Sequence, residues 1–331
     1  MQAILHNCCG MDVHKDSVVA CILKTREPII IERQREAVDK EIKVFGTFPD
    51  DLAQMRQWLE AEGCHHVAME STGVYWQPIY EALEDAAGGE MEILVVNARH
   101  MKNVPGKKTD MKDAEWIASL LRSGLLAGSF IPPQEVREFR QLTRYRKNVV
   151  QDVNTQKNRI EKTLQQAGFK LSTFLSDVFG VSGRNLIRVL IKNGRLSSSD
   201  IDDGTKRISK EKKAEIKRAI TGRLTDKQRS FLQLQITLLD GLLAHLESIE
   251  ASISELSAKW DNDIERLSTI PGIGLTSATA IIGEIGSDVS KFPSAEHFCS
   301  WAGLAPGDNM SAGKKKYKDH FRQPIHQGYN L

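Results

Sequence analysis

The first 130 residues alternate between two hydrophobic periods. Strand-like alternation of apolar and polar positions falls in five segments: 10–24, 28–34, 42–48, 65–71 and 91–98. Amphipathic helical spacing fills three more: 48–63, 74–89 and a stretch around 107–121. The predicted order is βββαβαβα. Three strands that can pair as a meander, followed by strands reached through helices, predict a mixed sheet covered by helices.

Strand patterns stop near residue 134. We predict a long basic helix over 135–168, short helices over 174–204 and a second long helix over about 225–261. The second long helix has a 3,4 alternation of apolar residues with one polar member: Leu232, Gln235, Leu239, Leu242, Leu246, Ile249, Ile253 and Leu256. This alternation predicts a coiled-coil seam. It leaves open whether the seam closes within the chain, as a helical hairpin, or between chains.

The last 70 residues change character again, as "LSTIPGIGLTSATAIIGEIG" leads into "FPSAEHFCSWAGLAPGDNMSAGKKK". We therefore expect three domains: an α/β sheet domain at 1–130, a helical coiled-coil region at 131–262, and a small α-helical domain at 263–331.

Composition excludes several classes of protein. With 40% hydrophobic and 27% charged residues, the chain resembles an ordinary soluble globular protein. It has no signal-peptide pattern and no run of about 18 apolar residues, so we expect a cytoplasmic protein with no membrane partner. The five cysteines form no C-x-x-C pair. Cys64-His65-His66 could bind a metal, but neighbours on a strand point to opposite faces, which disfavours it.

The small net charge of +2 conceals an asymmetry along the chain. Residues 1–130 hold 14 basic and 20 acidic residues, a net of −6, whereas 131–260 hold 24 and 15, a net of +9. Positive charge on helices suits a phosphate backbone, and Arg144, Arg146 and Lys147 are candidate contacts. A solvated helical surface would have the same composition.

Four acidic residues fall on elements that could bring them together: Asp12 in the first strand, Glu70 at the end of the fourth, and Asp110 with Asp113 on the helix after the fifth. Residues i and i+3 share a helix face, so Asp110 and Asp113 project together. Acids so placed converge in an RNase H-like sheet, where such hard oxygen ligands hold Mg²⁺. Two ions about 4 Å apart would stabilise both oxygens of a phosphoryl transfer. We expect the four carboxylates to converge within metal-bridging reach even when no metal is bound.

Other interpretations of these residues are open. Lysines could neutralise the helix pair instead, namely Lys107, Lys108 and Lys112, or Lys107 and Lys108 could steer a nucleic-acid phosphate. The same fold core carries sugar kinases and actin-like ATPases, but no glycine follows Asp12 closely. The "GKKT" at 106–109 is not a phosphate loop either, because Met101 replaces its first glycine.

Two motifs near the C-terminus suggest contacts with phosphate. Gly272 and Gly274 in "IPGIGLTSATAII" suit a helix-hairpin-helix turn, which aims backbone N–H groups at a phosphate; a tight turn without a ligand would look the same. Ser311 lies in a glycine-flanked, loop-like segment and could be a nucleophile, although most loop serines are surface residues. Three lysines follow it: Lys314, Lys315 and Lys316.

Four long motifs occur in order over nearly the whole chain: "GMDVHKDSVVACIL", "VAMESTGVYWQPIYEALE", "VVNARHMKNVPGKKTDMKDAEWIASLLRSGLL" and "IPGIGLTSATAIIGEIGSDVSKFPSAEHFCSWAGLAPGDNMSAGKKK". With these motifs the sequence resembles the DEDD insertion-sequence transposases, relatives of the Piv DNA invertases that are now described as bridge-RNA-guided recombinases.

The resemblance implies a RuvC-like N-terminal domain, a coiled-coil linker and a C-terminal transposase domain. It implies that Mg²⁺ is held by four acids, Asp12, Glu70, Asp110 and Asp113, and that Ser311 is the nucleophile. The acids of one protomer and the serine of another would form a composite site in a homo-oligomer, a dimer or a tetramer. A structured guide RNA would pair with target and donor DNA.

One segment departs from the family. After the lysines, "YKDHFRQPIHQGYNL" replaces a Gly-Asn-containing basic segment, so we expect a shortened C-terminal tail. Two other functions remain open: a junction-resolving, RNase H-like nuclease that uses the four acids and water, and an inactive copy that binds nucleic acid through its basic helices.

Overall fold

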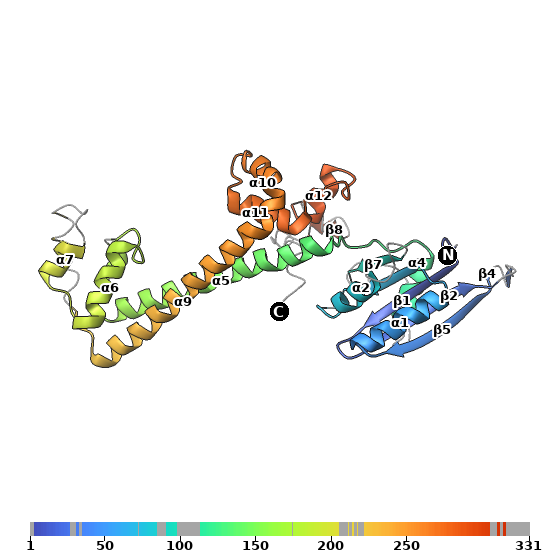
Figure 1. Ribbon diagram of the computed structural model, residues 1–331, viewed down its shortest axis with the longest axis horizontal. Helices are drawn as coiled ribbons and strands as arrows, with labels where there is room; N and C mark the ends of the chain where they lie inside the picture. Colours follow the sequence, from blue (N-terminus) through green and yellow to red (C-terminus); the bar gives the residue numbers. More distant parts are fainter. Residues whose placement is uncertain are drawn as a thin grey trace. The chain divides into compact units, whose positions relative to one another are not determined.

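The computed structural model describes most of the chain: residues 3–26, 31–32, 35–71, 73–84, 91–97, 113–173, 175–204, 211, 214, 217, 222–304, 310–311 and 314–315. Contacts divide the chain into two units (Figure 1). The first unit comprises 1–131 with 290–331, and the second comprises 132–289. Within the described residues, no helix is both long enough and apolar enough to span a membrane.

The first unit contains a five-stranded sheet in the order β5-β2-β1-β6-β7. Its strands are β1 (Asn7–Val13), β2 (Val18–Thr25), β5 (Val38–Phe45), β6 (His66–Glu70) and β7 (Glu92–Val96). Strand β2 pairs antiparallel with β1 and β5, whereas β6 is parallel to β1 and β7. A two-stranded ladder of β3 (Ile31–Glu32) and β4 (Arg35–Glu36) comes between β2 and β5 in the chain. This mixed sheet, with its first strand at the centre, confirms the predicted RuvC/RNase H-like α/β class.

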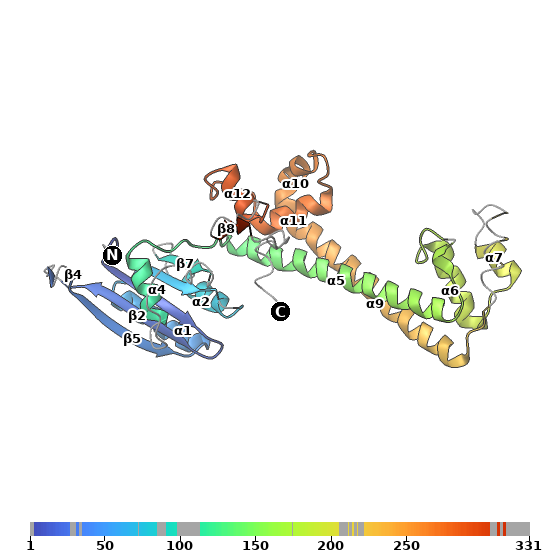
Figure 2. The ribbon, with the colours of Figure 1, turned by 180° about the vertical axis from the view of Figure 1, so that it is seen from behind.

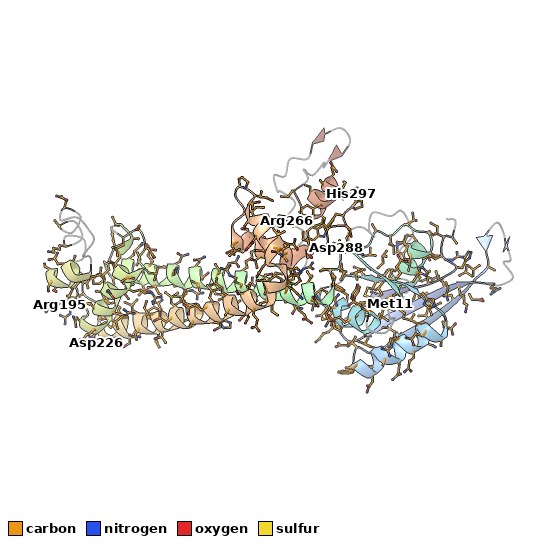
Figure 3. All side chains as sticks on the ribbon, turned by 45° about the horizontal axis from the view of Figure 1, so that its top comes forward. Met11, Arg195, Asp226, Arg266, Asp288 and His297 are labelled. Atoms are coloured by element: carbon orange, nitrogen blue, oxygen red, sulfur yellow. The ribbon has the colours of Figure 1, made fainter. Side chains whose placement is uncertain are left out.

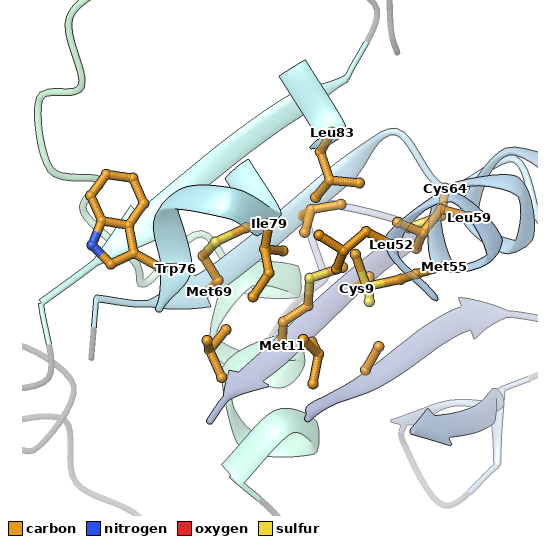
Figure 4. Packing of buried hydrophobic residues seen from close by; sticks show 14 of the residues in the cluster. Cys9, Met11, Leu52, Met55, Leu59, Cys64, Met69, Trp76, Ile79 and Leu83 are labelled. Atoms are coloured by element: carbon orange, nitrogen blue, oxygen red, sulfur yellow. The ribbon is translucent and has the colours of Figure 1, made fainter. Parts of the chain in front are cut away.

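Helices cover both faces of this sheet (Figure 2). α1 (Pro49–Ala61) and α2 (Trp76–Glu84) lie on one face, and α4 (Asp113–Arg122) lies on the other. Met11 and Met69 pack against α1 and α2 in a core shown in Figure 4. Because successive strand residues point to opposite faces, Cys8 and Ala68 face α4 instead. The same alternation decides which face each acidic residue can occupy.

The second unit is built on two long helices, α5 (Gln134–Gln166) and α9 (Asp226–Ser257), which lie side by side (Figures 1 and 2). Arg146 Nε donates to Glu250 Oε1 at 3.0 Å, and Gln156 Nε2 donates to the Gln235 carbonyl at 3.0 Å. The residue that is later in α5 pairs with the residue that is earlier in α9, so the two helices are antiparallel. The seam of α9 therefore closes within the chain as a helical hairpin.

The predicted seam holds for most of α9 and is wrong at its end. Leu232, Leu239 and Ile253 are buried as predicted. Leu256, however, is 51% exposed, and Ser257 is buried in its place. A strict 3,4 alternation repeats every 3.5 residues, whereas an α-helix has 3.6 residues per turn, so the alternating positions rotate slowly around the helix. By the end of α9, the residue after the predicted position faces the partner helix.

Shorter helices pack at each end of the hairpin, where Figure 3 labels Asp226 and Arg195 at one end and Arg266 at the other. The first group is η1 (Leu171–Thr173), α6 (Val181–Asn193) and α7 (Ser198–Gly204). The second is η2 (Ala258–Trp260), α10 (Asp261–Ser268) and α11 (Leu275–Ile285). α11 packs on α5 through Ile282 and Phe139. By contacts, residues 263–289 thus group with the long helices, although the sequence pattern placed them with the last domain.

The remaining elements belong to the first unit: α12 (Ala295–Trp301), β8 (Met310–Ser311) and β9 (Lys314–Lys315). Phe130 contacts Phe292 and Trp301, with ring centroids 5.1 and 5.8 Å away. Phe298 contacts the same two rings. This aromatic cluster joins the segment before α12 and α12 itself to the end of the first unit's N-terminal part.

Candidate active site

Strand register brings Asp12 and Glu70 together. The recorded pairs between the parallel strands β1 and β6 end at Met11 with Met69, and Asp12 and Glu70 are the next residue on each strand. Met11 and Met69 both face α1 and α2, so Asp12 and Glu70 both face α4. Neighbouring strands lie about 4.8 Å apart. The two carboxylates therefore leave the sheet as neighbours on one face.

A close helix–strand contact places Asp113 at the same end of that face. A Cβ added to Gly10 would lie 2.2 Å from the Ala118 nitrogen and 2.3 Å from the Ala114 carbonyl oxygen, so the backbone of α4 rests directly on β1. Cys8, earlier on β1, donates to the Ala118 carbonyl at 3.5 Å. α4 therefore runs against the direction of β1, with its first residue, Asp113, toward the end of β1 that carries Asp12.

The turn after β1 contributes one more side chain. His14 Nε2 lies 3.2 Å from Asp12 Oδ2. The His14 side chain is 58% exposed and the Asp12 side chain 22%. The carboxylate of Asp12 is thus accessible to solvent and already has a nitrogen neighbour on one oxygen.

The structure places only part of the predicted acidic group. Asp110 lies outside the described residues, as do Lys107, Lys108 and Lys316. Among the residues that the structure does describe, no three His, Cys, Asp or Glu side chains come close enough to hold a metal ion. Asp12, Glu70 and Asp113 therefore share an end of one sheet face without forming a closed metal cage.

Ser311 lies in a short hairpin rather than in a loop. It ends β8 and pairs with Lys314, the first residue of β9. The preceding pair joins Met310 to Lys315. Ser311 and Lys314 are thus backbone neighbours across a ladder of two residue pairs.

Of the basic residues predicted to contact nucleic acid, Arg144 and Arg146 have protein partners and Lys147 faces solvent. Arg144 donates from Nε and Nη2 to the two carboxylate oxygens of Glu284, each at 2.8 Å. Arg146 bonds Glu250 on the facing helix, whereas Lys147 is exposed. The two arginines therefore join helices of the second unit, and a phosphate would have to compete with their carboxylate partners.

Gly272 and Gly274 lie in the turn between α10 and α11, with open space where side chains at these positions would project. Gly272 has φ +90°, which favours glycine for conformational reasons. Gly274, the N-cap of α11, has an extended backbone with φ −82°. A Cβ at either position would meet no atom within 4 Å. Neither backbone conformation nor packing therefore requires a glycine at position 274.

Family models match both ends of the chain. One, described as "Transposase" and of the IS110 DEDD type, matches residues 9–169, which span nearly all of the sheet and the whole of α5. Another, described as "Transposase IS116/IS110/IS902 family", matches residues 264–324. The chain belongs to the IS110 family of DEDD transposases. It is thus an enzyme of the class that cleaves and rejoins DNA. Neither match bears on the likeness to Piv invertases.

Other comparisons add less to the IS110-family assignment. Among curated proteins, none matches the sequence. Solved structures that resemble this transposase include Thermus thermophilus RuvC, at 13% identity and a TM-score of 0.27, covering 37% of this chain and 99% of RuvC. The T. thermophilus RuvC complex with a Holliday junction substrate gives the same values.

Four of the transposase's cysteines are buried thiols that suit packing rather than chemistry. Burial raises the pKa of Cys8 and of Cys64 to about 12 and that of Cys21 to about 11, and it raises the pKa of Cys9 as well. Thiols, unlike thiolates, are poor nucleophiles and metal ligands. The Cys64-His65-His66 run is therefore disfavoured as a metal site in this transposase.

Sequence reasoning missed two residues of this site. Gly10 interrupts an apolar strand pattern, which is the usual signal of a close backbone approach, and it seats the helix that carries Asp113. His14 follows Asp12 by two positions at a turn, and only the folded turn shows that its ring reaches back to the carboxylate.

Proposed function

We propose that this transposase cleaves and rejoins the DNA of an insertion sequence by a metal- and serine-dependent phosphoryl transfer, guided by a structured RNA. The observation that carries the proposal is the position of Asp12 beside Glu70, on the sheet face and at the end where α4 brings Asp113. We also propose that the chain is organised, as predicted, into a sheet domain, a coiled-coil region and a C-terminal domain.

The described part of the site fits a divalent metal. Its donors are carboxylates, the hard oxygen ligands that Mg²⁺ prefers, and Asp12 is open to solvent. The residues that would hold two ions are Asp12, Glu70, Asp110 and Asp113. When bound, Mg²⁺ would stabilise charge on the scissile phosphate.

Ser311 would supply the nucleophile. Its Oγ attacks the scissile phosphorus and forms a phosphoserine bond while the bond to the leaving deoxyribose oxygen breaks; the serine proton passes to water, and the leaving oxygen takes up a proton from water to become a hydroxyl. Lysines beside it would offset the growing negative charge, namely Lys314, Lys315 and Lys316. The covalent bond conserves the energy of the broken phosphodiester, so a second hydroxyl can displace the serine without ATP. We propose that the acids and the serine come from different protomers of a dimer or tetramer.

Several residues would hold nucleic acid. Lys107 and Lys108 precede the acidic helix and would steer a phosphate, and Lys147 is free to contact a backbone from solvent. Arg144 and Arg146 would contribute by exchanging their carboxylate partners for phosphates. At Gly274, where the fold does not require a glycine, the missing side chain would let a DNA backbone approach the turn formed with Gly272.

A recombination assay with the element's end DNA, target DNA and transcribed RNA tests this function. Asp12→Asn and Glu70→Gln each keep side-chain size and remove a negative charge, so each should lower strand joining by at least about 100-fold. Ser311→Ala should abolish both joining and the covalent protein–DNA band. Lys227→Ala, an exposed substitution in α9, serves as the matched control and should recombine normally.

Three outcomes would contradict parts of the proposal. Joined products from Ser311→Ala would remove the serine step. Free ends that depend on Asp12 but not on Ser311 would instead assign a water-dependent, junction-resolving nuclease. Recombination without RNA would remove the guide.

A further inference from the structure

The turn between β1 and β2 holds His14 in a fixed place beside Asp12. The His14 backbone N–H donates to the Ser17 carbonyl at 2.9 Å, which closes the turn. Thr47 Oγ1 donates to the Lys15 carbonyl at 3.2 Å and ties the same turn to the segment before α1. The His14 ring therefore extends from an anchored backbone, and its Nε2 lies 3.2 Å from Asp12 Oδ2.

We propose that His14 is a positioning residue for Asp12, its Nε2 in contact with Oδ2 so that the rest of the carboxylate faces the metal. This inference rests on the proposed metal-dependent function. The terminal torsion of an aspartate is broad, so a free carboxylate samples many orientations. A polar contact from a residue outside the metal's own ligands selects one of them and reduces the entropy lost on metal binding.

A purely structural role fits the contact less well. His14 is more than half exposed and is absent from the cores on both faces of the sheet. Its removal should leave folding nearly unchanged, since exposed ion pairs contribute little to stability. The consequence of losing His14 should appear in metal affinity.

The test measures Mn²⁺ binding to the full chain by electron paramagnetic resonance, with Mn²⁺ as a visible substitute for Mg²⁺. His14→Ala should weaken Mn²⁺ binding by about 10- to 100-fold, the range seen when such supporting groups are removed. His14→Gln keeps an N–H donor near the same position and should stay within about threefold of the unmodified chain. His6→Ala, at an exposed histidine just before β1, is the control and should bind normally. Circular dichroism checks that each variant folds.

An Asp12→Asn arm separates failure of this inference from failure of the proposed function. Unchanged Mn²⁺ affinity in Asp12→Asn would overturn the metal site itself. Weak binding in Asp12→Asn with normal binding in His14→Ala would overturn only the role of His14. A nitrogen coupling to Mn²⁺ that disappears in His14→Ala would make His14 a direct ligand and would also overturn the positioning role.

Discussion

Gly10 decides how closely the helix carrying Asp113 can approach the strand carrying Asp12. No side chain separates β1 from α4 there, because Ala114 and Ala118 present backbone atoms to the glycine. The ion pair between Lys40 and Glu115, 3.0 Å apart, also ties α4 to β5. A substitution at Gly10 should therefore affect both the stability of the protein and the geometry of the acidic site.

Gly10→Ala tests this dependence. The new methyl would overlap backbone atoms of α4, which cannot rotate away, so we expect a loss of about 3 kcal/mol in the free energy of unfolding and reduced recombination. The measurement is urea unfolding followed by tryptophan fluorescence. Gly241→Ala, in α9 with no atom within 4 Å of the new Cβ, is the control and should stabilise by about 0.5–1 kcal/mol. Equal effects of the two substitutions would show that α4 is not seated on Gly10.

The buried thiols predict a dependence of stability on alkaline pH. Folding raises the pKa of Cys8 and Cys64 to about 12 and that of Cys21 to about 11, from an ordinary value of 9.0. Above pH 9 the unfolded chain loses thiol protons that the folded chain keeps, so stability falls as pH rises. The contribution is full below pH 9 and is lost between about pH 9 and 12. Urea midpoints should therefore fall from pH 8.5 to 10.5, and less steeply in Cys21→Ala.

At the scale of elements, Arg144 and Glu284 form a connection between α5 and α11. Two guanidinium nitrogens of Arg144 each donate to a different carboxylate oxygen of Glu284, and each side chain is a third or less exposed. Arg140 adds a bond from Nη2 to the Glu284 carbonyl. The C-terminal end of α11 is thus held on the hairpin by charge-assisted hydrogen bonds.

A double-mutant cycle of Arg144→Met and Glu284→Gln should give a coupling energy of about 1–2 kcal/mol, reduced from a fully buried pair by solvent screening. Thermal unfolding of the four proteins supplies the measurement. The exposed pair of Lys259 with Glu135, which also joins α5 to its neighbours, is the matched control and should couple by only a few tenths of a kcal/mol. Equal coupling in both cycles would argue against a specific role of the bidentate geometry.

At the scale of the whole molecule, α9 keeps large apolar side chains out of the hairpin. Phe231, Leu234 and Leu238 are 53%, 69% and 52% exposed and are spaced by three and four residues, so they share one face of α9. That face differs from the buried one formed by Leu232 and Leu239. We propose that it contributes to the contact between protomers.

Leu234→Glu combined with Leu238→Glu should reduce the oligomer to smaller species, because burying two charges at an apolar contact is costly. Light scattering after gel filtration measures the mass. Gln233→Glu together with Thr237→Glu, on a neighbouring polar face of α9, is the control and should keep the assembly. An unchanged mass in the leucine variant would place the protomer contact elsewhere.

Much of the fold could be predicted from local patterns. Alternation along β1 and β6 predicted the strands that carry Asp12 and Glu70, and the 3,4 spacing predicted α9. Such patterns succeed because burial of one face imposes a period on the sequence. They fail where the period of the pattern differs from that of the helix, as at Leu256, which a strict 3,4 alternation places on the seam but which is exposed.

The sequence by itself predicted the family and the alternation of strands and helices, because these follow from motifs and periodicity read along the chain. It did not predict every strand: the run 10–24 is two strands, β1 and β2, and segment 28–34 contributes only β3, which lies outside the five-stranded sheet. Only the tertiary structure decided which side chains become neighbours. Strand register placed Glu70 beside Asp12, the missing side chain of Gly10 let α4 settle on β1, and the anchored turn brought His14 to the carboxylate. Each of these contacts joins residues by the geometry of backbone pairing or close packing, which no local pattern of apolar and polar residues encodes.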